Sequence, residues 1–286
     1  MAYGAEINRE NPTSIVFLID QSKSMALPFG KQPERKKADG VADAINRLLQ
    51  TLCINCARAD GMHEYFQIGV IGYGRTVQSA FGDRFADQGL VPIGDISRQP
   101  LRIETRSKLM DDGAGGVFKR DLRFPVWFDA VAAGKTPMRP ALDLATRWLS
   151  QFLTEHPHCY PPLVINITDG QADDDPAPAA AELCGLTSAD GHVLLFNAHL
   201  SERHDPPIRF PQTDAGLPND FARLLFRMSS VLPPKAVQAV LQAEQDPGNS
   251  SGVGAESRGF VFNADLVEMV QFLDIGTKSA LGAVRR

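Results

Sequence analysis

Short apolar runs alternate with amphipathic stretches along most of the chain, and no other feature of the sequence constrains its fold as strongly. Each run has about the length of a buried strand and is bounded by polar or turn-forming residues. The runs are SIVFLID (14–20), YFQIGVIGY (65–73), VQSAF (77–81), LVINITD (163–169), HVLLFNAHL (192–200) and FVFNA (260–264). Strands that alternate with helices predict a mostly parallel sheet with helices on both faces.

The stretches between these runs carry apolar residues at helical spacing. Helices are expected at 34–59, at 138–155, after an Asp175 N-cap and Pro176, from 221 to Pro233, at 235–244, and at 265–276 with an end at Gly276. The link Gly74-Arg75-Thr76 is too short for a parallel crossover, so the strands on either side of it should pair antiparallel. We therefore expect an α/β protein: a Rossmann-like three-layer αβα sandwich whose central sheet is mostly parallel with one antiparallel edge strand.

The last strand and helix have the pattern of sheet elements rather than of a separate module. We therefore expect a single domain over residues 1–286, with a core of about 12–280 and a long insertion at about 82–134. The insertion is rich in Gly, Arg and Asp and has weak periodicity, and loops of this length are often functional or mobile. Within it, DDGAGG (111–116) lacks the GK[ST] ending of a nucleotide loop, so a mobile loop tip is the better interpretation.

The insertion also holds two candidate partner contacts. Basic residues outnumber acidic ones between Arg98 and Arg123, which indicates either a second surface for a partner or a solvated segment of mixed charge. Trp127 and Phe128 follow, either as exposed anchors for a partner or as core residues packed on the sheet.

Composition excludes several classes of function. The chain has 286 residues, a net charge of −5 and no long basic stripe, so we expect no binding to nucleic acid. No apolar run approaches the ~20 residues of a membrane-spanning helix. The N-terminal segment MAYGAEINRENPTS lacks the apolar core of a signal peptide, so we expect a soluble, cytoplasmic protein without membrane contact.

Cys53 and Cys56 have a CxxC spacing that is typical of metal or redox sites. No second CxxC or CxxH pair is present to complete a zinc site. Both residues lie in the stretch expected to be helical, where a free thiol packs as a small hydrophobe. We therefore expect two buried structural cysteines.

Oxygen-bearing side chains follow the carboxyl ends of two expected strands. Asp20 ends the first strand and is followed by Ser22 and Ser24, Asp169 ends LVINITD, and Thr136 precedes a helix in AGKTPM. In an open parallel sheet, ligands collect at this edge. These are hard donors without His or Cys, and they suit Mg²⁺, with Mn²⁺ or Ca²⁺ as alternatives. Neutral hydroxyl ligands leave much of the ion's charge uncompensated, so such a site favours a further carboxylate from outside.

The pattern Asp20-x-Ser22-x-Ser24, with Thr136 in GKTPM and Asp169 in ITDG, resembles the metal-ion-dependent adhesion site of von Willebrand factor A (vWA) domains. The order of elements is also similar, so the resemblance covers roughly residues 12–280. It implies that the two serines bind the ion directly and that the threonine binds it directly or through water. The two aspartates would act mainly through bound waters, and a Glu or Asp of a protein partner would complete the site.

Two positions depart from the common form of this site, namely Gln21 and Lys23, where small residues are usual. Lys23 brings a cation near the site, either to deter unspecific metal binding or to help hold an acidic partner. The acidic run Asp173-Asp174-Asp175 follows the site and indicates either a solvated helix N-terminus or an auxiliary cation site.

The segments FPVWFDAVAAGKTPM, PPLVINITDG and ARLLFRMSSVLP resemble bacterial stand-alone intracellular members of the vWA family. Such members are often encoded near Ser/Thr kinases and protein phosphatases or beside AAA+ ATPases, so the resemblance implies a partner from one of these systems. The expected function is a metal-dependent protein–protein interaction module and not an enzyme. The alternative is a Mg²⁺-dependent phosphohydrolase with Asp20 as nucleophile, although Ser22 then stands where haloacid-dehalogenase-like phosphatases carry a second acid.

Overall fold

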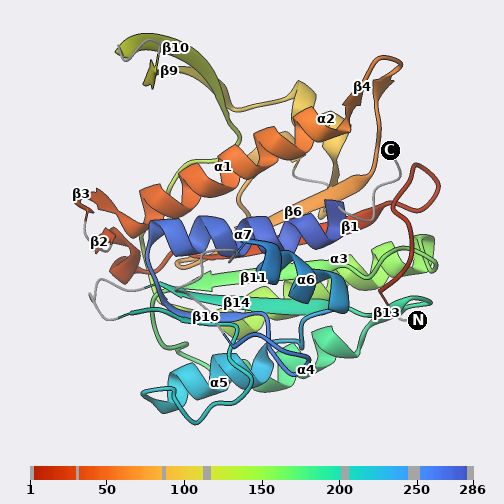
Figure 1. Cartoon of the computed structure of the whole chain (residues 1–286), viewed down its shortest axis with the longest axis vertical. Coiled ribbons are helices and arrows are strands. Elements are labelled where there is room, and N and C mark those ends of the chain that lie inside the picture. Colours follow the sequence, from red (N-terminus) through yellow and green to blue (C-terminus); the bar gives the residue numbers. More distant parts are fainter. Residues whose placement is uncertain are drawn as a thin grey trace.

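An eight-stranded sheet forms the centre of the computed structural model, which describes residues 3–29, 32–85, 88–111, 117–200, 206–243 and 252–281 (Figure 1). Its strands are β1 (Thr13–Asp20), β6 (Phe66–Tyr73), β7 (Val77–Ser79), β8 (Val91–Pro92), β11 (Leu163–Thr168), β14 (Leu194–Leu200), β15 (Ile208–Arg209) and β16 (Phe260–Ala264). The order is β15-β16-β14-β11-β1-β6-β7, and β8 also pairs with β6. The five longest strands are mutually parallel, which confirms the mostly parallel sheet.

Antiparallel strands border the sheet at both edges. β7 pairs antiparallel with β6, as the short link at 74–76 predicts, and β8 joins the same strand. At the opposite edge, β15 pairs antiparallel with β16. β8 and β15 are only two residues long and carry no hydrophobic period of their own, which is why the sequence predicts β7 as the one antiparallel edge strand.

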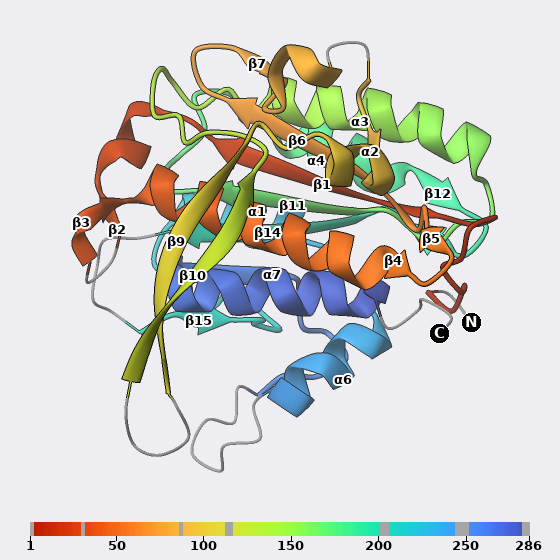
Figure 2. The same cartoon turned by 90° about the horizontal axis from the view of Figure 1, so that it is seen from above.

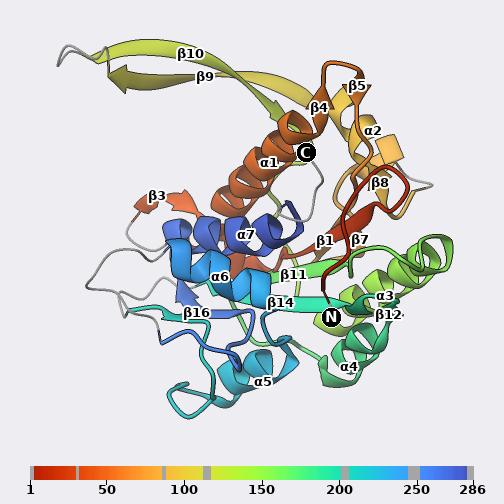
Figure 3. The ribbon, with the colours of Figure 1, turned by 45° about the vertical axis from the view of Figure 1, so that its right-hand side comes forward.

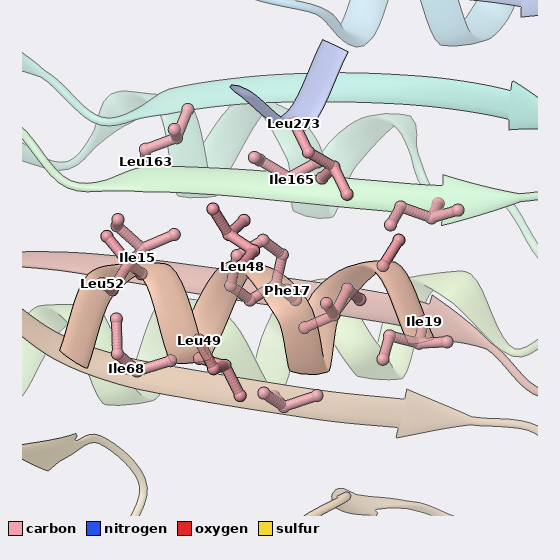
Figure 4. Packing of buried hydrophobic residues seen from close by; sticks show 14 of the residues in the cluster. Ile15, Phe17, Ile19, Leu48, Leu49, Leu52, Ile68, Leu163, Ile165 and Leu273 are labelled. Carbon is pink, nitrogen blue, oxygen red and sulfur yellow. The ribbon is translucent and has the colours of Figure 1, made fainter. Parts of the chain in front are cut away.

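Helices cover both faces of the sheet. One face carries α1 (Lys37–Cys56), α6 (Pro234–Ala243) and α7 (Leu266–Leu281), and the other carries α3 (Met138–Glu155), α4 (Ala177–Gly185) and α5 (Asp220–Met228). Side chains of β1 alternate between the two layers: Ile15, Phe17 and Ile19 pack under α1 (Figure 4), whereas Val16 and Leu18 face α3. This confirms the three-layer αβα sandwich.

Short elements complete the described chain. They are two single-turn 3₁₀ helices, η1 (Lys23–Ala26) and η2 (Gly82–Phe85), the helix α2 (Ile93–Arg98), and the two-stranded pairs β2 (Pro28–Phe29) with β3 (Gln32–Lys36), β4 (Ala57–Arg58) with β5 (Gly61–Met62), and β12 (Thr187–Ser188) with β13 (Gly191–His192). No helix within the described ranges has both the length and the apolar character needed to cross a bilayer.

The stretch at 82–134 is more regular than its sequence predicts. It contains η2, β8, α2 and a long hairpin of β9 (Arg102–Asp111) and β10 (Val117–Val126), paired from Arg102–Val126 to Asp111–Val117. The hairpin leaves the body of the molecule, and its free end lies on the same side as β2 and β3 (Figures 1, 2 and 3). Most described residues of β10 are exposed, so the strands lack the alternation that would reveal them. Residues 112–116 of DDGAGG lie outside the described part of the chain, and the expectation of a loop tip stays a prediction.

The base of the hairpin is anchored in the core. Trp127 and Phe128 are 2% and 3% exposed, so they are core residues and not anchors for a partner. The Asn46 side chain on α1 accepts a hydrogen bond from the Trp127 N–H at 2.8 Å and donates one to the Phe128 carbonyl at 3.1 Å. The indole N–H donates to the Ile96 carbonyl at 2.6 Å.

A chain of buried polar side chains crosses the sheet. The Tyr73 hydroxyl donates to Asn166 Oδ1 at 2.7 Å, and Asn166 Nδ2 donates to Asn197 Oδ1 at 2.9 Å. Asn197 Nδ2 then donates to Ser229 Oγ at 2.9 Å on the helix side. The chain links β6, β11 and β14, and every member satisfies another, which fixes their side-chain positions.

Several helix ends differ from the prediction. The helix expected at 34–59 spans only Lys37–Cys56, because residues 34–36 belong to β3 and 57–58 belong to β4. The helix expected to run up to Pro233 ends at Met228. The closing helix continues through Gly276 to Leu281. The N-cap of α4 is Pro176, one residue later than expected, although Asp175 Oδ1 still accepts from the Ala177 N–H at 3.1 Å.

Candidate metal centre

The strand order brings the candidate ligands together. Taken in chain order, β1, β6, β7, β11, β14 and β16 are arranged 3-2-1-4-5-6, and the order reverses between β1 and β11. The crevice at such a reversal, beyond the carboxyl ends of the strands, is the usual ligand site of an open α/β sheet. Asp20 is the last residue of β1 and Asp169 directly follows β11.

Asp20 is a buried carboxylate held in one orientation. Its Oδ1 accepts from the Ser22 N–H at 2.8 Å and its Oδ2 accepts from the Thr168 hydroxyl at 2.7 Å. Burial raises the pKa of Asp20 to about 6, the two hydrogen-bonding residues lower it, and the nearby charge of Asp169 adds a smaller upward shift. No ion pair with Asp20 occurs within the described ranges. It is therefore ionised at neutral pH at a cost in free energy that a bound cation would reduce.

The hydroxyls of Ser22 and Ser24 form a chain to Asp169. The two Oγ atoms lie 2.9 Å apart, and Ser24 Oγ donates to Asp169 Oδ1 at 2.7 Å. Adjacent ligands of an octahedral ion at ~2.1 Å are about 3.0 Å apart. The separation of the two hydroxyl oxygens therefore fits a shared Mg²⁺ or Mn²⁺, and so does the all-oxygen donor set.

Thr136 lies beside these residues on a loop that is tied to them by the backbone. The Ala133 N–H donates to the Gln21 carbonyl at 2.6 Å, and the Lys23 N–H donates to the Gly134 carbonyl at 3.3 Å. Gly134 has φ +104°, and a Cβ there would lie 2.4 Å from the Arg75 nitrogen, so the loop depends on glycine at this position. Thr136 is buried, but across the described residues no hydrogen bond joins its hydroxyl to the other four candidates.

The acidic run holds the threonine loop in place. Asp173 Oδ2 accepts from the Thr136 N–H at 2.5 Å, and the Thr136 carbonyl accepts from the Asp173 N–H at 3.1 Å. Asp174 Oδ1 accepts from the Arg139 N–H at 3.1 Å. Two of the three aspartates thus satisfy the N-terminus of α3, where the helix dipole favours negative charge, and only Asp175 serves α4.

Lys37 is a charged residue of the centre that lies outside the sequence motifs. Its Nζ lies 2.8 Å from Asp169 Oδ2, and the side chains of the pair are 3% and 0% exposed. The cation bonded to the candidate centre is therefore Lys37, whereas Lys23 lies exposed at the start of η1. A signal existed: position 37 precedes Val41 and Ile45 at a spacing of four, so this lysine occupies the buried stripe of α1.

The cysteines form no competing site. Cys53 and Cys56 are free and buried on α1, and burial raises the pKa of each thiol to about 12, so both are protonated at neutral pH. Over the residues that the structure describes, no three His, Cys, Asp or Glu side chains are grouped to hold a metal ion. Any metal at the edge of the sheet must therefore depend on the hydroxyls as well as the two carboxylates.

Comparison with known proteins gives only distant likenesses. No family model matches the chain, and no curated protein matches it. Among solved structures, it is similar to a von Willebrand factor type A protein from Catenulispora acidiphila, with 14% identity, a TM-score of 0.39, and coverage of 66% of this chain and 33% of the other. The ArnB paralog VWA2 from Sulfolobus acidocaldarius has 13% identity, a TM-score of 0.33, and coverage of 66% and 35%.

A third solved structure is the vWF domain of the type V pili tip protein Mfa5 from Porphyromonas gingivalis. It has 14% identity, a TM-score of 0.32, and coverage of 57% of this chain and 39% of the other. The chain thus spans between 33% and 39% of the length of these structures. Scores this low carry no argument about function, and the fold class rests on the strand order and layers described above.

Proposed function

We propose that this protein is a metal-dependent protein-interaction module of the vWA type. The observation that supports this proposal most directly is the meeting of three chain segments at the reversal of strand order. The first segment contributes the buried Asp20, which has no ion pair within the described ranges, and the hydroxyls of Ser22 and Ser24, 2.9 Å apart. The second contributes the Asp169 carboxylate, which is hydrogen-bonded to Ser24, and the third contributes the buried Thr136.

In this proposal, Ser22, Ser24 and Thr136 hold a divalent cation, with Mg²⁺ the first choice. Asp20 and Asp169 accept hydrogen bonds from its waters and orient them. The bound ion would supply a positive charge that bridges to a Glu or Asp of another protein. The burial of Asp20 and the loop bonds at Gln21 and Lys23 hold these groups before any ligand arrives.

The proposal is one of binding without catalysis. The resemblance to bacterial intracellular vWA proteins suggests a partner from a kinase, phosphatase or AAA+ ATPase system in the cytoplasm. Among the described residues of the site, Ser22 stands two positions after Asp20, where haloacid-dehalogenase-like phosphatases carry a second acid, and this disfavours a phosphohydrolase. Hydrolysis of a chromogenic phosphate ester that disappears in Asp20→Asn would favour the enzyme instead.

The hairpin β9–β10 is the surface that we propose gives specificity. Lys119, Arg120 and Arg123 are exposed on β10, beside Phe118 at 46% and Leu122 at 37% exposure. Basic and apolar side chains together suit an acidic protein face. The free end of the hairpin lies on the same side of the molecule as β2 and β3, which follow Ser22 and Ser24 in the chain (Figure 3). One partner could therefore contact both the hairpin and the metal centre.

Calorimetry tests the metal-dependent part. Calorimetric titration with Mg²⁺ and Mn²⁺ should give one site in the wild type and none in Ser22→Ala/Ser24→Ala. The matched control is Ser150→Ala/Thr154→Ala, which removes two hydroxyls near the far end of α3 and should bind as the wild type does. Equal binding by the wild type and the first double variant would refute the proposed ligands.

Affinity capture from native lysate, with Mg²⁺ or with chelator, tests the partner. Proteins retained only with Mg²⁺, and lost in the Ser22/Ser24 variant, are the expected result. Lys119→Glu/Arg120→Glu should lose the same proteins while its Mn²⁺ affinity stays unchanged. Recovery of the same proteins in every arm would contradict metal-bridged recognition.

A further inference from the structure

We propose that Lys37 couples metal binding to carboxylate binding, so that the cation and the partner's acid bind tightly only as a pair. This inference rests on the proposed function of the centre. The observation behind it is the buried ion pair between Lys37 Nζ and Asp169 Oδ2 at 2.8 Å.

The fold holds this lysine in place. Lys37 is the first residue of α1, and its N–H donates to the Leu27 carbonyl at 3.0 Å. Its position on the buried stripe of the helix directs the side chain inward, so that the residue is only 2% exposed. The other oxygen of Asp169 accepts from Ser24 Oγ, so the same carboxylate contacts both the lysine and a proposed metal ligand.

Counting charges shows the consequence. Asp173 and Lys23 are exposed, so solvent screens their charges. Among the buried charged groups, Asp20 and Asp169 contribute −2 and Lys37 contributes +1, which leaves −1 for the centre. A divalent cation changes this sum to +1, whereas the same two carboxylates without the lysine would be neutralised. A buried net charge is costly unless a counter-charge accompanies it. One incoming carboxylate brings the sum to zero.

The cation and the carboxylate should therefore bind cooperatively. The positive charge of Lys37 reduces the affinity for metal alone, because the centre would then carry an uncompensated charge of +1. A carboxylate alone is repelled by the net charge of −1. Each ligand increases the affinity of the other by the same factor. In an alternative role, the Lys37 ammonium would take the place of the metal ion and no cation would bind. Lys37 pairs with Asp169, however, so the buried charge of Asp20 would then have no ion pair in the described chain, which disfavours this alternative.

The test is Mn²⁺ titration of the full chain, followed by calorimetry and by the electron paramagnetic resonance signal of free Mn²⁺. It is done in sodium acetate and in sodium chloride of equal ionic strength, with acetate as the carboxylate probe. In the wild type, acetate should tighten Mn²⁺ binding. In Lys37→Met, Mn²⁺ should bind at least about tenfold more tightly in chloride, since a unit charge is removed a few ångströms from a divalent ion. The effect of acetate should then shrink.

Controls separate charge from folding. Lys37→Arg keeps the charge and should keep the wild-type dependence on acetate. Lys235→Met removes an exposed lysine on α6, away from the centre, and should leave that dependence nearly unchanged. Lys37→Gln is a second neutral variant whose amide can still donate to Asp169, for use if the methionine variant does not fold. It should show the same gain in affinity.

The results distinguish the proposed role of Lys37 from the proposed metal centre itself. Mn²⁺ binding by the wild type that ignores acetate, or neutral variants that bind Mn²⁺ no more tightly than the wild type, would overturn the role of Lys37 and leave the metal centre intact. Absence of Mn²⁺ binding by every variant in both salts would overturn the metal centre and the role of Lys37 together.

Discussion

Replacing Asp20 with asparagine should stabilise the protein in chelator while weakening its affinity for divalent metal. Asparagine keeps the shape of the side chain and removes the buried charge. Its carbonyl can still accept from the Ser22 N–H, and its amide can donate to the Thr168 hydroxyl, which already bonds to the Gly170 backbone. A binding site can contain a buried charge that destabilises the fold until the ligand binds. Neutralising such a charge is expected to increase stability and to weaken ligand binding.

The magnitude follows from the pKa. Burial raises the pKa of Asp20 from 3.8 to about 6, and each unit corresponds to roughly 1.4 kcal/mol between the two protonation states. Ionised Asp20 therefore costs the folded protein roughly 3 kcal/mol at pH 7.5. Imperfect replacement of the hydrogen bond to Thr168 would cost about 1 kcal/mol. We expect Asp20→Asn to unfold with a free energy about 1–3 kcal/mol higher than that of the wild type in chelator.

The stability difference between Asp20→Asn and the wild type should depend on pH. Because the folded-state pKa lies above the unfolded-state value, the folded state binds more protons between pH ~4 and ~6, and wild-type stability falls as pH rises through that range. The advantage of the variant should thus be complete above pH ~6 and disappear toward pH ~4.

Urea unfolding in EDTA at several pH values measures this difference, and Mg²⁺ added at pH 7.5 should stabilise the wild type far more than the variant. Asp143→Asn on α3, where the side chain is 48% exposed, serves as a control and should change stability little. A variant that is less stable than the wild type at pH 7.5 and equally responsive to Mg²⁺ would refute the reasoning.

Three further outcomes are expected. Tyr73→Phe should lower the free energy of unfolding by about 1–3 kcal/mol in urea, because Asn166 Oδ1 loses its buried donor; no change would mean that the polar chain is not fixed. Cys53 and Cys56, with pKa values of about 12, should react with iodoacetamide at pH 8 only after denaturation, and rapid modification of the folded protein would contradict their burial. Gly134→Ala should weaken Mn²⁺ affinity and lower the melting temperature, since the new Cβ meets the Arg75 backbone; unchanged affinity would show that the threonine loop does not support the centre.

The main strands and helices could be predicted because their periodicity is strong. The run at 163–169 and the helix at 138–155 appear almost as expected. The reversal of strand order beside β1 is a property of the fold that the order of the elements along the chain does not determine. The same pattern brings Ser22, Ser24 and Asp169 together, although their binding of metal stays a prediction.

Other features depend on contacts that no local pattern reveals. Residues 117–123 of β10 are all exposed, so this strand has no buried face that would produce hydrophobic alternation in its sequence. The role of Asp173 and Asp174 at α3 depends on residues far along the chain. Lys37 could have been recognised as a charge on a buried stripe, but its partner Asp169 is 132 residues away and emerges only from the fold.

The most direct test of the account is a crystal structure of the protein grown with Mn²⁺, with an anomalous difference map measured for the metal. We predict one strong peak at roughly 2.0–2.3 Å from Ser22 Oγ and Ser24 Oγ, with waters that bridge it to Asp20 and Asp169. A map without a peak at these serines, or with the peak at Asp173–Asp175 instead, would contradict the central claim.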